Sequence, residues 1–138
     1  MTVALCCDDP KSGESITRQV SKLCHVTTES FYNISDFIAK VSGCPDTVML
    51  IAQTGALSTE TAMAAREHNP QGKLIWFSDL DFALLSFRLK ATYFGLLPVE
   101  EDKLKTALSY CNIPLIGEKL NRIMSSEQTC NDIITERK

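Results

Sequence analysis

The residues of this sequence that could do chemistry stand at the ends of short apolar runs. Asp8 and Asp9 follow residues 3–7, and Ser78 ends residues 73–78. Adjacent carboxylates are suited either to bind a hard cation such as Mg²⁺ or to cap the amino end of the next helix. A serine at the end of a strand can equally be a cap or turn residue. The sequence alone does not decide between a chemical role and a capping role, either for Asp8 and Asp9 or for Ser78.

A third apolar run brings no reactive group to the same place. In an open parallel sheet the functional crevice lies outside the carboxyl ends of the strands, so the residues that end each run carry the most information. Residues 47–52 end in Ile51 and Ala52, followed by Gln53. Ile51 therefore offers an alkyl group where the neighbouring runs offer oxygen atoms.

The elements that must position these residues alternate along the chain. Short apolar runs are separated by segments of helical period, which is typical of βαβ units and of a parallel sheet covered on both faces. The predicted strands cover residues 3–7, 24–30, 47–52, 73–78 and 92–97, and the predicted helices cover 12–23, 34–41, 58–68, 81–90 and 100–111. The pattern predicts an α/β protein, a three-layer doubly wound sandwich.

Composition excludes several classes of function. The 138 residues fit one domain, and a net charge of −3 provides no basic field of the kind that nucleic-acid binding needs. No apolar run approaches the roughly 18 residues of a membrane-spanning helix. We therefore expect a cytoplasmic protein whose domain binds neither nucleic acid nor membrane.

The cysteines indicate neither a zinc site nor a disulfide framework. They stand at positions 6, 7, 24, 44, 111 and 130, without a C-x-x-C pair, and His25 beside Cys24 is the one adjacent histidine. This pattern favours reduced structural thiols.

The end of the chain reads differently from the rest. Pro114 and Gly117 interrupt the helical pattern after residue 112. We expect one domain over residues 1–112 and a helical extension or linker over residues 113–138, with an amphipathic turn formed by Ile116, Leu120 and Ile123.

Two stretches carry a family resemblance. VALCCDDP resembles the first strand and paired acids of response-regulator receiver domains, and KLIWFSDLDFALLSFRLKATYFGLLPV resembles their fourth strand, fourth helix and fifth strand, especially in regulators that carry a LytTR DNA-binding domain. The resemblance covers residues 1–112 and implies a five-stranded flavodoxin-like sheet of order 2-1-3-4-5. In that family the two acids hold Mg²⁺, and an Asp ending strand three accepts a phosphoryl group. A Ser or Thr ending strand four contacts the phosphate, and a Lys before a Pro neutralises it.

Matched residue by residue, the chain keeps part of this set. Asp8 and Asp9 fall on the acids, Ser78 falls on the phosphate-contacting hydroxyl, and Phe94 falls on the aromatic switch position. Pro98 also matches, and the resemblance implies a cis peptide bond before it. Asp79 lies near the crevice, where we interpret it as a helix-capping acid and not as a substitute phosphoacceptor.

Two positions depart from the family where the chemistry takes place. Ile51 occupies the phosphoacceptor position, and Leu97 occupies the position of the lysine that contacts the phosphate. A phosphoaspartate requires a carboxylate nucleophile, and only Asp8, Asp9 and the carbonyl of Gln53 are left to bind a cation. We expect weak or vestigial Mg²⁺ binding and no other cofactor.

The same two departures predict a packed site. Aliphatic side chains can replace a charged pair without loss of stability, so we expect Ile51 and Leu97 to form an apolar plug over the strand ends. The plug predicts that Ile51→Asp lowers the melting temperature and that adding Leu97→Lys recovers part of the loss.

The resemblance implies a pseudo-receiver in two-component-type signalling, a protein-interaction module that is independent of phosphorylation and is not an enzyme. Its partner would be a kinase, a regulator or a second copy of the chain in a homodimer. The implied interaction surface includes Phe82, Phe87, Arg88 and Tyr110. Two alternatives remain: the receiver part of a longer LytTR-type transcription regulator, and a small-ligand-binding domain that uses the former phosphorylation crevice.

Overall fold

A computed structural model describes residues 1–117, in which strands and helices alternate without exception. In chain order they are β1 (Thr2–Cys7), α1 (Pro10–Leu23), β2 (Thr27–Phe31), α2 (Ile34–Val41), β3 (Thr47–Gln53), α3 (Gly55–His68), β4 (Leu74–Ser78), α4 (Ala83–Arg88), β5 (Tyr93–Leu96) and α5 (Glu101–Tyr110).

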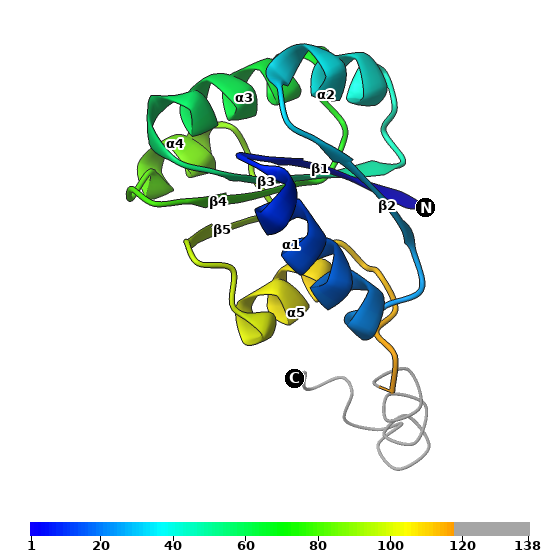
Figure 1. The fold of residues 1–138 in the computed structure, drawn as a ribbon. Coiled ribbons are helices and arrows are strands. Elements are labelled where there is room, and N and C mark those ends of the chain that lie inside the picture. Colours follow the sequence, from blue (N-terminus) through cyan, green and yellow to red (C-terminus); the bar gives the residue numbers. More distant parts are fainter. Residues whose placement is uncertain (118–138) are drawn as a thin grey trace, which may run out of the picture.

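The strands form one parallel sheet in the order β2-β1-β3-β4-β5. Helices α2, α3 and α4 cover one face, and α1 and α5 cover the other, which gives three layers (Figure 1). The predicted doubly wound, flavodoxin-like sheet of order 2-1-3-4-5 is therefore confirmed.

Two apolar cores result, one on each face of the sheet. Successive side chains of a strand point to opposite faces, so neighbouring residues of β3 enter different cores. Leu50 packs in the cluster beneath α1 and α5, whereas Ile51 packs in the cluster beneath α2, α3 and α4. The central strands are buried on both sides, which explains why they read as continuous apolar runs.

Several boundaries differ from the predicted ones by a few residues. Strand β2 begins at Thr27 and not at residue 24, because Cys24 forms an isolated antiparallel bridge with Leu115 instead. Helix α3 begins at Gly55, before the predicted start at residue 58, and Gly55 has a φ of +67° that favours glycine.

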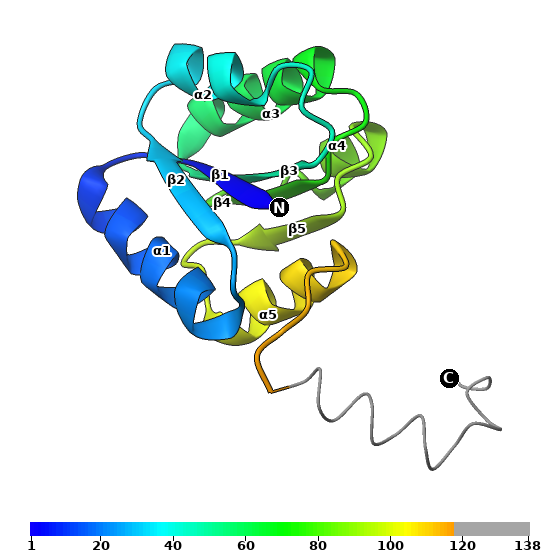
Figure 2. The same cartoon turned by 90° about the vertical axis from the view of Figure 1, so that its right-hand side faces the viewer.

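The packed part of the chain continues beyond the predicted boundary at residue 112. Ile113 and Leu115 are buried in the core beneath α1 and α5, and the amide of Ile116 donates to the carbonyl of Leu23 at 2.8 Å. Figure 2 shows this segment after α5 running toward the end of α1. The rest of the predicted extension, including Leu120 and Ile123, lies outside the described residues.

Within residues 1–117, no helix is long and apolar enough to cross a bilayer. The cysteines at 6, 7, 24, 44 and 111 are all free thiols, as the sequence predicts. Cys130 lies outside the described residues.

Candidate functional site

The carboxyl ends of β1, β3 and β4 lie side by side and define the candidate site. Cys7 is paired with Ala52, and Gln53 is paired with Ser78. The next residue of the first strand, Asp8, therefore falls beside Gln53. Since β3 runs one residue further than predicted, Gln53 stands at the strand end between Asp8 and Ser78.

Ile51 lies two residues inside β3 and not at the crevice. It is fully buried in the core that also contains Phe37 and Trp76. Leu97 packs against the opposite core, beneath α1 and α5. The expected apolar plug is therefore wrong, because the sheet separates the two side chains. The equivalence of position 51 with the phosphoacceptor stays a prediction from the resemblance, and Gln53 is the residue of β3 that the geometry places at the crevice.

The two adjacent acids serve different helices. Asp9 caps α1, accepting a hydrogen bond from the Ser12 amide at 2.9 Å, and Pro10 is the first helical residue. The carboxylate of Asp8 crosses to α3, where it accepts from the Thr54 amide at 3.2 Å and from the Thr54 hydroxyl at 3.1 Å. Asp9 therefore takes the capping role, one of the two roles that the sequence left open for it.

These contacts do not fit a strong Mg²⁺ site. Magnesium requires near-octahedral oxygen ligands, usually carboxylates that converge on one point together with several waters. The carboxylates of Asp8 and Asp9 are hydrogen-bonded to two different helix starts. Among residues 1–117, no group of three Asp, Glu, His or Cys side chains is placed to hold a metal ion.

Asp79 joins Asp8 at the start of α3. Its Oδ1 accepts a hydrogen bond from the Gly55 amide at 2.8 Å, whereas the amide of Ala83, the first residue of α4, donates to Asp81 at 3.0 Å. Asp79 is therefore a capping acid, as predicted, but for α3. Two carboxylates thus face the positive end of the α3 dipole, where anions are favoured, and use the first free amides of the helix.

Ser78 is fully buried and belongs to a network that the sequence did not reveal. Its hydroxyl lies 2.9 Å from that of Ser58 on α3 and 3.4 Å from Oδ1 of Asp79. Ser58 also accepts from the indole nitrogen of Trp76 at 3.3 Å. The contact between residues 58 and 76 could not be predicted from the sequence, because it depends on how α3 packs on β4.

Gln53 is the other buried polar residue at the strand ends. It has no exposed surface, and neither atom of its side-chain amide has a hydrogen-bond partner among the described residues. An amide is neither a nucleophile for phosphoryl transfer nor an anionic metal ligand. The end of β3 is therefore polar but chemically unreactive.

The thiols that precede the crevice are also unreactive. Burial raises the pKa of Cys6 to about 12 and that of Cys7 to about 11, and the nearby carboxylates add to both increases. A cysteine acts as a nucleophile in its thiolate form. At neutral pH both side chains are protonated and pack as apolar groups.

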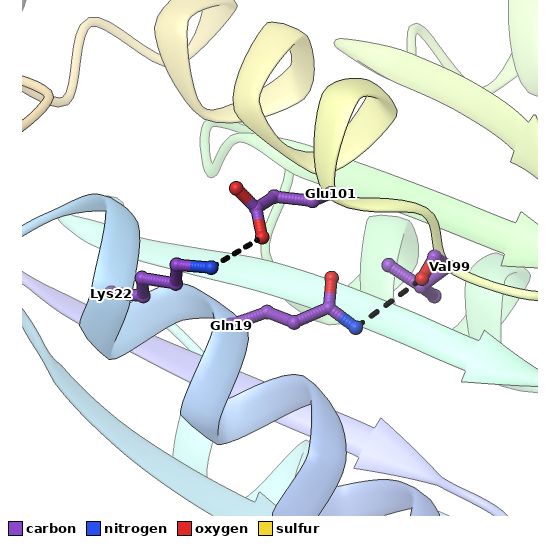
Figure 3. A network of polar contacts seen from close by, with 4 residues as sticks. All are labelled: Gln19, Lys22, Val99 and Glu101. Carbon is purple, nitrogen blue, oxygen red and sulfur yellow. Dashed lines mark hydrogen bonds and ion pairs between the residues drawn. The ribbon is translucent and has the colours of Figure 1, made fainter.

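The segment after β5 is joined to α1 by polar contacts. The Leu97–Pro98 peptide bond is cis, as the resemblance implies. The side-chain amide of Gln19 on α1 donates to the carbonyl of Val99 at 3.3 Å, and Lys22 forms a 3.1 Å ion pair with Glu101 (Figure 3). These contacts join α1 to the start of α5.

The expected interaction residues divide into a buried and an exposed group. Phe82 is partly buried, because it stacks on Trp76 with ring centroids 5.5 Å apart and packs against the core beneath α2, α3 and α4. Phe94, at the switch position, meets the same indole edge-on at 5.2 Å. Phe87, Arg88 and Tyr110 are exposed, as predicted.

Further apolar side chains are exposed on α4 and β5. Phe87 is 80% exposed and Leu84, one helical turn earlier on α4, is 67% exposed. Leu96 on β5 is also exposed. We call Leu84, Phe87, Leu96 and Tyr110 the α4–β5–α5 patch.

Comparison with known proteins supports the fold. The chain is similar to the BeF3-activated DrrB receiver domain, with a TM-score of 0.60 and 16% identity, over 79% of this chain and 96% of that one. It is also similar to a structure described as the adenylate cyclase from Rhodopirellula baltica, with a TM-score of 0.64 and 15% identity, over 92% and 94% of the two chains. No protein-family model and no curated protein matches the sequence. The protein therefore has a receiver-like fold.

Proposed function

We propose that this protein is a degenerate receiver, a cytoplasmic protein-interaction module of two-component-type signalling that is not an enzyme and works without accepting a phosphoryl group. The observation that carries the proposal is that side chains of the protein itself occupy the crevice. Gln53 ends β3, while Asp8 and Asp79 bind the first amides of α3. The amide donors at the start of α3, which an incoming anion would need, are already paired with these two carboxylates.

The α4–β5–α5 patch supports an output through protein contact. Exposed aromatic and leucine side chains on neighbouring elements are typical of interaction surfaces, where a few such residues contribute most of the binding energy. An apolar patch can bury itself against its own copy across a two-fold axis. We therefore propose a homodimer formed through this patch.

The alternative of a small-ligand-binding domain has lost its main support. It depended on an apolar crevice formed by Ile51 and Leu97, and Ile51 is inside the core.

Incubation with acetyl phosphate and Mg²⁺ is expected to leave the protein unmodified. Without a carboxylate at the end of β3, the site has no positioned nucleophile. Intact mass spectrometry measures the result, and a receiver that has its acceptor aspartate serves as the positive control under the same conditions. A stable phosphoryl adduct on Asp8, Asp9 or Asp79 would contradict the proposal.

Phe87→Glu is expected to weaken self-association by at least about tenfold, because truncating or charging a central aromatic residue of an interface typically costs 2 kcal/mol or more. Sedimentation equilibrium over a concentration series measures the dissociation constant. Met63→Glu is the matched control, since Met63 is an apolar residue on α3 that is 52% exposed outside the patch. Equal effects of the two variants, or a wild type that stays monomeric at millimolar concentration, would argue against the homodimer.

A further inference from the structure

A chain of hydrogen bonds runs from the crevice into the core beneath α4. The indole nitrogen of Trp76 donates to Ser58 at 3.3 Å, Ser58 to Ser78 at 2.9 Å, and Ser78 to Oδ1 of Asp79 at 3.4 Å. Trp76, Ser58 and Ser78 are completely buried, and Asp79 is exposed at the crevice. These hydrogen bonds, which we call the Asp79–Trp76 hydrogen-bond chain, therefore join a surface carboxylate to a buried aromatic ring.

The two ends of this chain fix its direction. An indole N–H can only donate a hydrogen bond, and a carboxylate can only accept. Each serine hydroxyl has one proton: Ser58 accepts from Trp76 and donates to Ser78, and Ser78 then has its own proton to donate to Asp79. Consecutive hydrogen bonds in a low-dielectric interior polarise and strengthen one another. The hydrogen bonds thus form a continuous connection between the carboxylate of Asp79 and the indole N–H of Trp76.

Asp79 itself is held in place by α3. The Gly55 amide donates to the same Oδ1 atom at 2.8 Å, which is the shortest contact of the network. That amide lies at the amino end of a helix, where the dipole favours a negative charge. The carboxylate is thus an anion that the protein supplies itself.

The other end of the chain supports α4. Phe82, the residue that precedes α4, stacks on Trp76, and its carbonyl accepts from the Ser86 amide at 2.8 Å in the first turn of the helix. Phe94 of β5 packs against the edge of the same indole. Trp76 therefore supports both elements, because Phe82 before α4 and Phe94 of β5 pack on its indole ring.

We propose that Asp79 is a built-in anion that holds the Ser78–Ser58–Trp76 chain, and with it the α4–β5–α5 patch, in one fixed arrangement. In place of a transferred group, a permanent side chain occupies the donors of Ser78 and α3. The link to the patch rests on the function proposed above, whereas the link from Asp79 to Trp76 stands independently of it. Asp79 is a positioning residue in this role.

Trp76 provides the readout, because it is the only tryptophan of the protein. In a ¹H–¹⁵N NMR spectrum its indole gives one side-chain N–H signal, which moves upfield when its hydrogen bond weakens. Asp79→Ala removes the terminal acceptor and is expected to move this signal upfield. Asp79→Asn keeps an acceptor oxygen without the charge, and a smaller shift in the same direction is expected. Circular dichroism verifies that each variant is folded.

Two variants calibrate the shift. Ser58→Ala removes the direct partner of the indole and gives the largest upfield shift. Asp81→Ala removes another acid of the same loop, whose hydrogen bond goes to the Ala83 amide and not to Ser78, Ser58 or Trp76. An indole signal that stays at its wild-type position in both Asp79 variants overturns the proposal. So does a shift in Asp81→Ala as large as that in Asp79→Ala.

Sedimentation of the same variants separates this proposal from the function it rests on. If Asp79 fixes the patch, Asp79→Ala weakens self-association together with the indole shift. An indole shift with unchanged self-association overturns the link to the patch and leaves the chain from Asp79 to Trp76 in place. A failure of Phe87→Glu to affect the dimer overturns the proposed function instead, without moving the indole signal.

Discussion

Ile51→Asp is expected to lower the free energy of unfolding by more than about 3 kcal/mol, a large share of the stability of a small domain. Ile51 is completely buried, between Cys6 of β1 and Trp76 of β4. The substitution removes the hydrophobic contribution of an isoleucine and places a carboxyl group in an apolar core without a cation. Urea unfolding followed by circular dichroism measures the loss.

The double variant distinguishes the structure from the apolar plug that the sequence predicts. Adding Leu97→Lys is expected to recover none of the loss, because residue 97 packs against the core on the other face of the sheet. Gln53→Asp is the matched control, since it adds a carboxyl group to the same strand at its crevice end. We expect it to cost less than Ile51→Asp. Recovery by Leu97→Lys would mean that both side chains reach the same crevice.

The fold was largely predictable from the sequence. Buried parallel strands read as apolar runs because both of their faces are covered, and helices read as segments of helical period because only one face is covered. Residues 47–52 and 73–78 therefore located β3 and β4 to within one residue at each end. The order of the strands came from the family resemblance, since periodicity does not specify which strands pair.

The site was less predictable, because it depends on register. A one-residue change in the pairing register of a strand moves its side chains to the other face of the sheet, and a one-residue change in its length changes which residue stands at the strand end. The resemblance placed Ile51 at the crevice, but β3 extends one residue further than predicted, to Gln53, which pairs with Ser78 and lies two residues beyond Ile51. Likewise, the contact of Asp8 with Thr54 spans 46 residues and is not visible in the local sequence.

Arg66 holds together a part of the fold that no sequence pattern indicated. Its guanidinium donates to five backbone carbonyls, at distances of 2.8 to 3.2 Å. They belong to Asn69, Pro70 and Gly72 in the loop before β4, and to Leu89 and Lys90 after α4. The last carbonyls of a helix lack partners within it, so Arg66 satisfies groups that α4 leaves free. Partial burial lowers the pKa of Arg66, but an arginine remains charged at neutral pH.

Arg66→Ala is expected to lower the free energy of unfolding by about 3 kcal/mol, because hydrogen bonds from a charged donor contribute more than neutral ones and five carbonyls lose their partner together. Arg66→Lys should recover only part of this loss, since an ammonium group cannot reproduce the planar array of five N–H donors. Arg18→Ala, at an exposed position of α1, is the matched control and should change stability by less than about 0.5 kcal/mol. Urea unfolding compares the three variants. A lysine as good as the arginine would show that charge alone matters here, whereas the geometry requires that a single planar group bind both the loop before β4 and the end of α4.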